Sequence, residues 1–364
     1  MNKSIDLIGF GDPFLDLVIG IGRLPESNTN CPINDYCFQG GGNVATALCA
    51  ASVLGLKTEL VGSVGDDLFG KMSLADLKYN NVGISKMAVE KGTRSNFSIC
   101  VTESELQGKE FMSSHGDFCG LNPSDIDAEF IKSARMLHVG LITPAVVRAC
   151  EIIHESGGKV SIDAPYYKPH VYENYRHFDI FIGSEMYYNA MCESCGYDNN
   201  EYEKNMKAVQ CAGPDIVIFT FGGDGCRGVS GEKYFELPSF KVEAADTTGA
   251  GDVFHGAFDY AYLRGWDAEK CAHFASGASA VKCTRPGGRC ALPSLEVLEK
   301  FLEDTDHGIL DPCIYDHLSH LNLMVEIIVD QLKISQVFQT DIIVISVGFA
   351  VDPLEHGTVT VDHG

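Results

Sequence analysis

Short apolar runs, bounded by glycine and polar turns, alternate with longer segments of helical sequence along most of the chain. The apolar runs predict buried strands at 5–10, 58–64, 136–139, 160–163, 179–182 and 216–220. Helices are predicted at 43–54, 68–79 and 144–156. Strands that alternate with helices pair in parallel through crossovers. The pattern therefore predicts an α/β fold with a doubly wound, mostly parallel sheet that carries helices on both faces.

Two regions depart from this alternation. The β-prone runs 97–101 and 110–113 flank the polar turn 103–108, which predicts an antiparallel hairpin at about 96–114, inserted into the scaffold. From residue 305 onward the chain has no glycine-turn motif, although it contains the apolar run 342–347. We expect one domain over 1–304 and a C-terminal extension of unknown role over 305–364. The extension either packs on the domain or a partner, or stays unordered.

Composition and charge narrow the function classes. The 364-residue chain carries a formal net charge of −23, which argues against nucleic-acid and anionic-membrane partners. Its fourteen cysteines have no framework spacing. Even the close pair Cys192 and Cys195 is better explained by buried reduced thiols than by a redox or metal site. Because there is no signal-like N-terminus and no apolar run of membrane-spanning length, we expect a cytoplasmic protein.

The most informative chemistry lies at residues 246–258, which read Asp-Thr-Thr-Gly-Ala-Gly-Asp-Val-Phe-His-Gly-Ala-Phe. A small-residue turn runs into Asp252 and then into an apolar segment of helical sequence. Free N–H groups at a helix start can hold anionic oxygens, and the adjacent carboxylate can take a proton. Phosphoryl transfer to a hydroxyl needs both parts. The segment predicts a kinase that acts on a small alcohol, and the alternative role for Asp252 is that of a helix N-cap.

Two other loops imitate nucleotide-binding motifs. Residues 9–14 begin like a dinucleotide fingerprint but lack its third glycine, and they place Asp12 and Pro13 where the pyrophosphate needs N–H donors. Residues 65–72 have the spacing of a Walker loop, but two carboxylates in it would repel phosphate. Both loops are predicted to be structural turns. This argues against a nicotinamide-dependent dehydrogenase.

Several motifs occur in an order that resembles the ribokinase-like (PfkB-type) carbohydrate and nucleoside kinase family over roughly residues 5–304. The matching segments are 41–42 with the Ala-rich helix after it, 61–70, 220–225, 246–258 and 286–293. The resemblance implies a ribokinase-like fold with a small β-lid, to which the hairpin at 96–114 belongs. It also implies ATP and Mg²⁺ as cofactors, a sugar, sugar acid or nucleoside as substrate, and a homodimer.

The resemblance implies a role for each matched residue. Asp252 is the expected general base, and the amides of Gly249, Ala250 and Gly251 are the expected anion hole. The expected substrate-binding residues are Asp16, Gly41, Gly42 and Thr46, the last in place of the family's common Asn. The expected nucleotide-binding residues are Thr220, Gly222, Gly225 and Ser276. Asp246 and the carbonyl of Thr248 match positions that hold a monovalent cation, K⁺, in many members.

One departure from the family pattern leaves a second hypothesis open. Where the family usually carries Asn-x-x-Glu, this chain reads Ser184-Glu185-Met186-Tyr187, so Glu185 becomes the candidate to hold Mg²⁺ through water. The departure and the long C-terminal extension motivate an alternative function, that of a kinase-fold sensor that binds a sugar or nucleotide without chemistry. The intact Asp252 and its glycine turn favour the enzyme.

Overall fold

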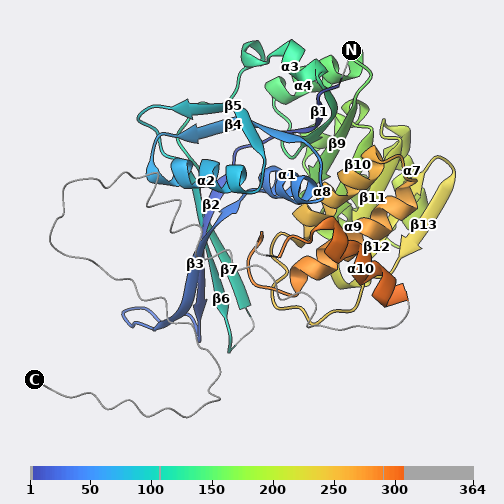
Figure 1. Cartoon of the computed structure of the whole chain (residues 1–364). Helices are drawn as coiled ribbons and strands as arrows, with labels where there is room; N and C mark the ends of the chain where they lie inside the picture. The colour runs from blue at the N-terminus through green and yellow to red at the C-terminus, as the bar shows by residue number, and fades with distance from the viewer. Residues whose placement is uncertain (1–2, 106–107, 290, 307–364) are drawn as a thin grey trace, which may run out of the picture.

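A nine-stranded, mostly parallel sheet forms the centre of the computed structural model, which describes residues 3–105, 108–289 and 291–306 (Figure 1). In sheet order, the strands are β13 (Lys233–Leu237), β12 (Cys226–Ser230), β11 (Ile216–Thr220), β10 (Ile180–Ser184), β9 (Lys159–Ala164), β8 (Ala134–Val139), β1 (Ile5–Phe10), β4 (Thr58–Gly65) and β5 (Gly83–Glu90). The pairs from β11 to β5 are all parallel, and β12 and β13 extend the sheet as an antiparallel hairpin. The predicted α/β fold is confirmed.

Helices cover both faces of this sheet, and each face has its own hydrophobic core. Along β10, Ile180 and Ile182 face one core while Phe181 faces the other. Strands buried on both sides in this way read as continuous apolar runs. One face packs against α1 (Asn43–Val53), α8 (Ala250–Leu263), α9 (Ala268–Cys283) and α10 (Leu295–Asp306). The other packs against α3 (Ala128–Lys132), α4 (Pro144–Glu155), α5 (Pro169–Tyr172), α6 (Glu185–Cys195) and α7 (Tyr202–Cys211).

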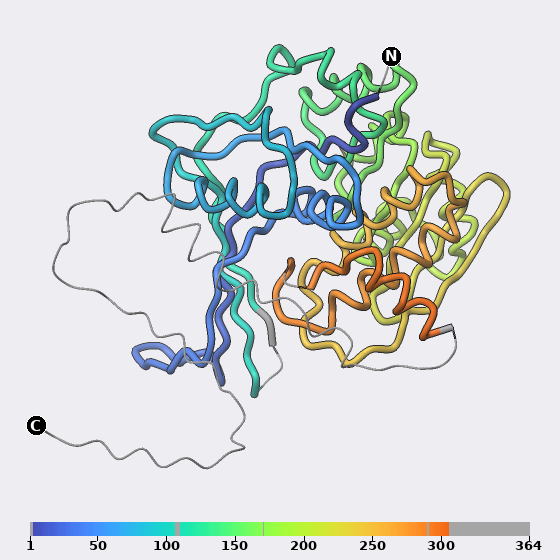
Figure 2. The backbone as a smooth tube through the Cα atoms, in the orientation of Figure 1, coloured from blue at the N-terminus to red at the C-terminus, as the bar shows by residue number. Residues whose placement is uncertain are grey.

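A second sheet of four strands forms the lid and extends away from the main sheet (Figure 2). Its order is β3 (Ile33–Gly41), β2 (Phe14–Ile21), β6 (Asn96–Glu103) and β7 (Gly108–Ser114). β6 and β7 pair antiparallel, which confirms the hairpin predicted at 96–114. The sequence analysis missed β2 and β3, because most of β3 is exposed and shows no alternation of apolar and polar residues.

The two outer strands of the lid carry exposed large apolar side chains. They are Ile33, Tyr36 and Phe38 on β3 and Phe111 and Met112 on β7, each between 38% and 59% exposed. Exposed apolar patches of this kind are typical of protein contact sites.

The two loops that imitate nucleotide motifs are structural turns, as predicted. Asp12 accepts a hydrogen bond from the Ser63 amide at 2.7 Å, which ties β1 to β4. Asp67 caps α2 (Leu68–Tyr79) by accepting from the Gly70 amide at 2.9 Å. Both carboxylates are therefore used to fix backbone, as side-chain oxygens at helix starts commonly are.

Three further predictions concern the cysteines, membrane-spanning helices and the domain boundary. Cys192 and Cys195 on α6 are both free thiols, in agreement with reduced cysteines. Among the described helices, none is both long enough and apolar enough to cross a bilayer. The domain boundary predicted at 304 falls within α10, and residues 307–364 of the predicted extension lie outside the described part of the chain.

Candidate active site

The turn at residues 249–251 opens α8 in the manner that its sequence predicts. Gly249 is the N-cap residue and has the left-handed conformation, with φ of 73°. A Cβ atom there would also lie 3.0 Å from the carbonyl oxygen of Gly288, so both the backbone angle and the space call for glycine. The residues that follow form a helix N-terminus, where the helix dipole favours negative charge. Of their amides, that of Ala250 donates to the Thr247 carbonyl at 3.2 Å.

Asp252 lies in the first turn of α8, next to those amides, and is half-buried. Burial raises the pKa of its carboxyl group to about 6, and the negative charge of Asp163 adds to the rise. A carboxyl group with a pKa near 6 is ionised at neutral pH but binds a proton readily, which suits a general base.

A buried imidazole–carboxylate pair lies near Asp252. Its imidazole belongs to His255, one turn further along α8, and its carboxylate belongs to Asp163. His255 Nε2 lies 3.1 Å from Asp163 Oδ1 at the end of β9, and Asn43 donates to Asp163 Oδ2 at 2.8 Å. Burial by itself would raise the pKa of Asp163, but the His255 charge and these hydrogen bonds hold it below its ordinary value. Burial would lower the pKa of His255, and Asp163 reverses this and raises it. Each member of the pair thus favours the charged form of the other.

A second buried pair continues this network into the sheet. His138 Nδ1 on β8 lies 2.8 Å from Asp259 Oδ2, and both side chains are fully buried. The His138 ring stands edge-on to the His255 ring, with 5.5 Å between centroids. Sequence reasoning did not identify this network. The signal was the i, i+3, i+7 spacing of Asp252, His255 and Asp259, which places the three on one face of α8.

A cavity of about 350 Å³ adjoins the start of α8. Its lining includes all four predicted nucleotide-binding residues, namely Thr220, Gly222, Gly225 and Ser276. Ala250 and Gly251 of the predicted anion hole line the same cavity. A pocket of this size, lined largely by small residues and backbone, can accept a flat ring system with its phosphates directed at the helix N-terminus. The structure thus brings the two predicted groups of residues together.

Asp16 lies on the lid strand β2, at the point where the lid meets the main domain. The Ser98 hydroxyl on β6 donates to Asp16 Oδ1 at 2.5 Å, and burial raises the pKa of the Asp16 carboxyl. A Cβ atom on Gly41 would lie 2.2 Å from Asp16 Oδ2, so the glycine makes room for the carboxylate. The predicted substrate residues Asp16 and Gly41 are therefore neighbours on adjacent strands.

Comparison with known proteins identifies the family. The model of the pfkB family of carbohydrate kinases matches residues 13–295, which include the lid strands, Asp16 and the whole of α8. The chain belongs to the pfkB family of carbohydrate kinases.

Individual relatives match this chain over nearly the whole of their own length. The nucleoside kinase of Methanothermobacter thermautotrophicus is 26% identical over 308 residues, which cover 83% of this chain and 97% of that protein. Fructokinase-1 of Zea mays is 27% identical over 326 residues, covering 81% and 98%. The structure of Arabidopsis thaliana ribokinase, complexed with ribose and ATP, has 20% sequence identity and a TM-score of 0.70, covering 82% and 99%. The fold of this pfkB kinase is therefore ribokinase-like.

Arg289 is the principal residue of this pfkB kinase site that the sequence analysis missed. It is 4% exposed, donates from Nε to the Thr46 hydroxyl at 3.0 Å and from Nη2 to the Gly41 carbonyl at 2.7 Å, and forms an ion pair with Asp76. Thr46, predicted to bind substrate, thus uses its hydroxyl to accept from Arg289. The only sequence signal was the position of Arg289, directly after the Gly-Gly pair of the segment 286–293.

The segment 287–289, hereafter the strap, connects the α8 turn to the lid. The Gly287 amide donates to Asp246 Oδ2 at 2.7 Å, and the Gly288 amide donates to Gln39 Oε1 on β3 at 2.9 Å. Arg289 then reaches α1 and α2. The other oxygen of Asp246 accepts from both the amide and the hydroxyl of Thr248, at 2.8 and 2.6 Å. A displacement of the lid strand β3 would therefore be transmitted to the anion-binding turn.

Glu185 is the first residue of α6, at the carboxyl end of β10, and is exposed. Ser184 caps that helix, accepting from the Tyr187 amide at 3.1 Å and donating to the Pro165 carbonyl at 2.7 Å. In the part of the chain that the structure describes, no three His, Cys, Asp or Glu side chains form a group that could hold a metal ion.

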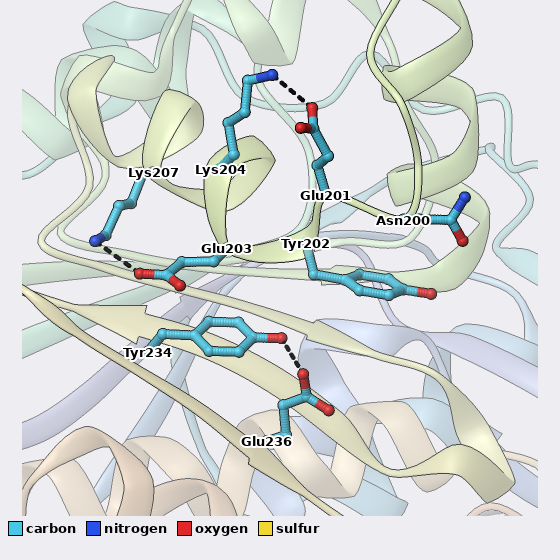
Figure 3. A pocket seen from close by; sticks show the side chains of 8 residues that line it. All are labelled: Asn200, Glu201, Tyr202, Glu203, Lys204, Lys207, Tyr234 and Glu236. Atoms are coloured by element: carbon cyan, nitrogen blue, oxygen red, sulfur yellow. Dashed lines mark hydrogen bonds and ion pairs between the residues drawn. The ribbon is translucent and has the colours of Figure 1, made fainter.

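A second hollow lies on the surface between α7 and β13 and contains none of the predicted site residues (Figure 3). Its side chains largely satisfy one another: Lys207 pairs with Glu203, Lys204 pairs with Glu201, and the Tyr234 hydroxyl donates to Glu236. Exposed pairs of this kind contribute little to stability or binding. We assign no role to this hollow.

Proposed function

We propose that this protein transfers the γ-phosphoryl group of ATP to a hydroxymethyl group of a sugar, sugar acid or nucleoside. The observation that carries the proposal is the continuity of one cavity with the start of α8. Ala250 and Gly251, the first two residues of α8, line the nucleotide-sized cavity. That arrangement directs a bound nucleotide's phosphates at the helix N-terminus.

In the proposed reaction, the substrate hydroxyl approaches Asp252 from the lid side. Asp252 accepts the hydroxyl proton as the oxygen attacks the γ-phosphorus and the bond to the ADP oxygen breaks. The amides of Gly249, Ala250 and Gly251 donate to the phosphoryl oxygens, where charge gathers in the transition state, and the Ala250 amide exchanges its hydrogen bond to the Thr247 carbonyl for one to phosphate. The His255 charge lowers the pKa of Asp252 and favours its ionised form, against the larger and opposite effect of the Asp163 charge.

Asp16 is proposed to bind substrate hydroxyls on the lid side. One of its oxygens is occupied by the Ser98 hydroxyl, and a carboxylate oxygen accepts well from sugar hydroxyls. Gly41 and Gly42 would allow close approach of the substrate to the backbone. Thr46 would act mainly through its hydrogen bond to Arg289.

Mg²⁺ is proposed to enter with ATP, with Glu185 as the acidic side chain that meets it through water. The ion's contribution would be to neutralise charge on the β- and γ-phosphates. The structure of Arabidopsis thaliana ribokinase, which has a similar fold, is complexed with ribose and ATP, and this supports a sugar and ATP as the classes of ligand.

Two copies of this chain are proposed to form a homodimer through their lids. Exposed apolar side chains on the outer strands of the lid, such as Tyr36 and Phe38 on β3, would be buried in such a homodimer. A small-molecule substrate, a cytoplasmic location and the absence of a nucleic-acid partner complete the proposal.

The test is a coupled ADP-release screen with ribose, fructose, 2-keto-3-deoxygluconate and adenosine. We expect one of them to release ADP at a rate well above that of ATP alone, and the product to carry one phosphate. If ATP binds but no member of a broad sugar and nucleoside panel is phosphorylated, the sensor hypothesis replaces the kinase.

A further inference from the structure

Lys282 is a fully buried cation beside the anion-binding turn. It lies in the last turn of α9, and its side chain is 0% exposed. Its Nζ donates to the backbone carbonyl of Asp246 at 2.7 Å. Burying an ammonium group is unfavourable unless oxygens surround it, so its position next to this carbonyl is a specific feature of the fold.

The residue that Lys282 contacts organises the whole turn. Asp246 uses one carboxylate oxygen for the amide and hydroxyl of Thr248 and the other for the Gly287 amide of the strap. Lys282 binds the carbonyl of the same residue. The peptide that opens the turn is therefore fixed from behind by a positive charge, and the remainder of the turn is fixed by the Asp246 carboxylate.

The donor set at Asp246 does not fit a bound monovalent cation, although the family resemblance implied one there. Both carboxylate oxygens already accept N–H or O–H donors, and the carbonyl is bound by an ammonium. A second unit positive charge next to a buried ammonium is repelled strongly, because little water screens the two.

We infer that Lys282 supplies the fixed positive charge of the anion-binding turn, and that this protein needs no K⁺ for phosphoryl transfer. Lys282 acts as a positioning residue: it holds the Asp246 carbonyl so that the following amides face the phosphoryl oxygens. The part that concerns the rate depends on the proposed function. The part that concerns cation binding does not.

The experiment compares the wild-type protein with Lys282→Met and Lys282→Arg in KCl, NaCl and choline chloride at equal ionic strength. Melting temperature is measured with and without ATP, and kcat and KM are measured with whichever substrate the screen identifies. Lys270→Met is the matched control, since Lys270 lies on the same helix but is exposed.

We expect the wild-type melting temperature to agree across the three salts within about one degree, and kcat to agree within about twofold. Lys282→Met should lower kcat by on the order of 10–100-fold while the substrate KM changes little, because the turn acts on the transition state. Lys282→Arg should retain most of kcat, and Lys270→Met should resemble the wild type.

Two results would overturn the inference. One is a wild-type protein that melts several degrees higher, or reacts tenfold faster, in KCl than in choline chloride. The other is a Lys282→Met protein with unchanged kcat. If Lys282→Met fails to fold, the wild-type salt comparison and Lys282→Arg still decide. If no substrate is found, the proposed function fails, and the melting temperatures of the wild type in the three salts still test the cation site.

Discussion

The two sides of the proposed active site, for the nucleotide and for the substrate, are built in different ways. The nucleotide side is an open cavity lined by small residues such as Gly222, Gly225 and Ser276. The substrate side is a set of buried charged groups, in which Arg289 joins Asp76, Thr46 and the Gly41 carbonyl next to Asp16. A ligand common to the whole family can be held by backbone and shape, whereas a variable substrate requires side chains whose charges must be balanced within the protein.

The difference also concerns what holds each side in place. The nucleotide cavity is lined by residues of α8, α9 and the β11–β12 turn, which belong to the main domain. The substrate side depends on the strap and the lid, which are connected through Gln39 and Arg289. We therefore expect changes on the substrate side to alter substrate KM and stability together, and changes on the nucleotide side to alter ATP binding alone.

The largest expected effect is at Asp252, where the two sides meet. Asp252→Asn should lower kcat by about 10²–10⁴-fold with ATP affinity retained, because the hydroxyl loses its proton acceptor. Steady-state kinetics and ATP titration measure both. Asp267→Asn is the control, since Asn caps a helix as well as Asp does. An active Asp252→Asn protein would contradict the proposed role.

The same variant tests how much the raised pKa of Asp252 lowers the free energy of unfolding. In the folded protein the Asp252 pKa is about 6, above the 3.8 of an unperturbed carboxyl group, so this group lowers stability progressively between about pH 4 and pH 6 and by its full amount above pH 6. Asp252→Asn should therefore stabilise the protein at pH 8 by about 1–3 kcal/mol, discounted for partial exposure, and by less at pH 5. Denaturant melts at the two pH values give the difference. An equal gain at both would indicate another cause.

Arg289→Met should have the next largest effect. It leaves the Asp76 and Asp16 carboxylates near one another without the guanidinium, and breaking a buried pair commonly costs about 3–5 kcal/mol. We expect a lower melting temperature and a substrate KM raised at least tenfold, with the KM for ATP changed much less. Arg264→Met, which removes an exposed guanidinium, is the matched control. Equal changes in both KM values would erase the distinction between the two sides.

Ser276→Phe should have the opposite effect to Arg289→Met: it should raise the KM for ATP and leave the substrate KM nearly unchanged. A phenyl ring on α9 would fill part of the space of about 350 Å³ and raise the KM for ATP, by about tenfold if one or two favourable contacts are lost. The substrate KM should stay within about twofold. Exposed Lys270→Met again serves as control. If both KM values rise together, the cavity is not the nucleotide side.

The smallest expected effect is on the pH profile. Because Asp252 must be ionised to accept a proton, kcat/KM should fall about tenfold per pH unit below pH 6. His255→Gln removes a positive charge that lowers the Asp252 pKa, so the acid limb should move to higher pH. Profiles from pH 4.5 to 8.5 show the shift. A shift to lower pH would mean that His255 does not stabilise the ionised base.

Local sequence determined much of this molecule. The α8 turn could be predicted because a helix N-terminus with glycines is formed by consecutive residues, and its chemistry follows from those residues alone. The strands of the main sheet could be predicted because burial on both faces produces continuous apolar runs. By contrast, β3 is largely exposed, so the lid was recognised only through its β6–β7 hairpin.

Only the tertiary structure revealed the contacts between distant segments. Arg289 meets Thr46 and Asp76 across 243 and 213 residues of sequence, and Lys282 meets the Asp246 carbonyl across 36. No periodicity or spacing signals such pairs, because a charged side chain in a sequence looks the same whether solvent or a buried partner surrounds it. The sequence alone thus determined the kind of chemistry and the family of the fold. The packing of the strap against the lid decided which buried charges meet Arg289, and the packing of α9 brought Lys282 to the Asp246 carbonyl.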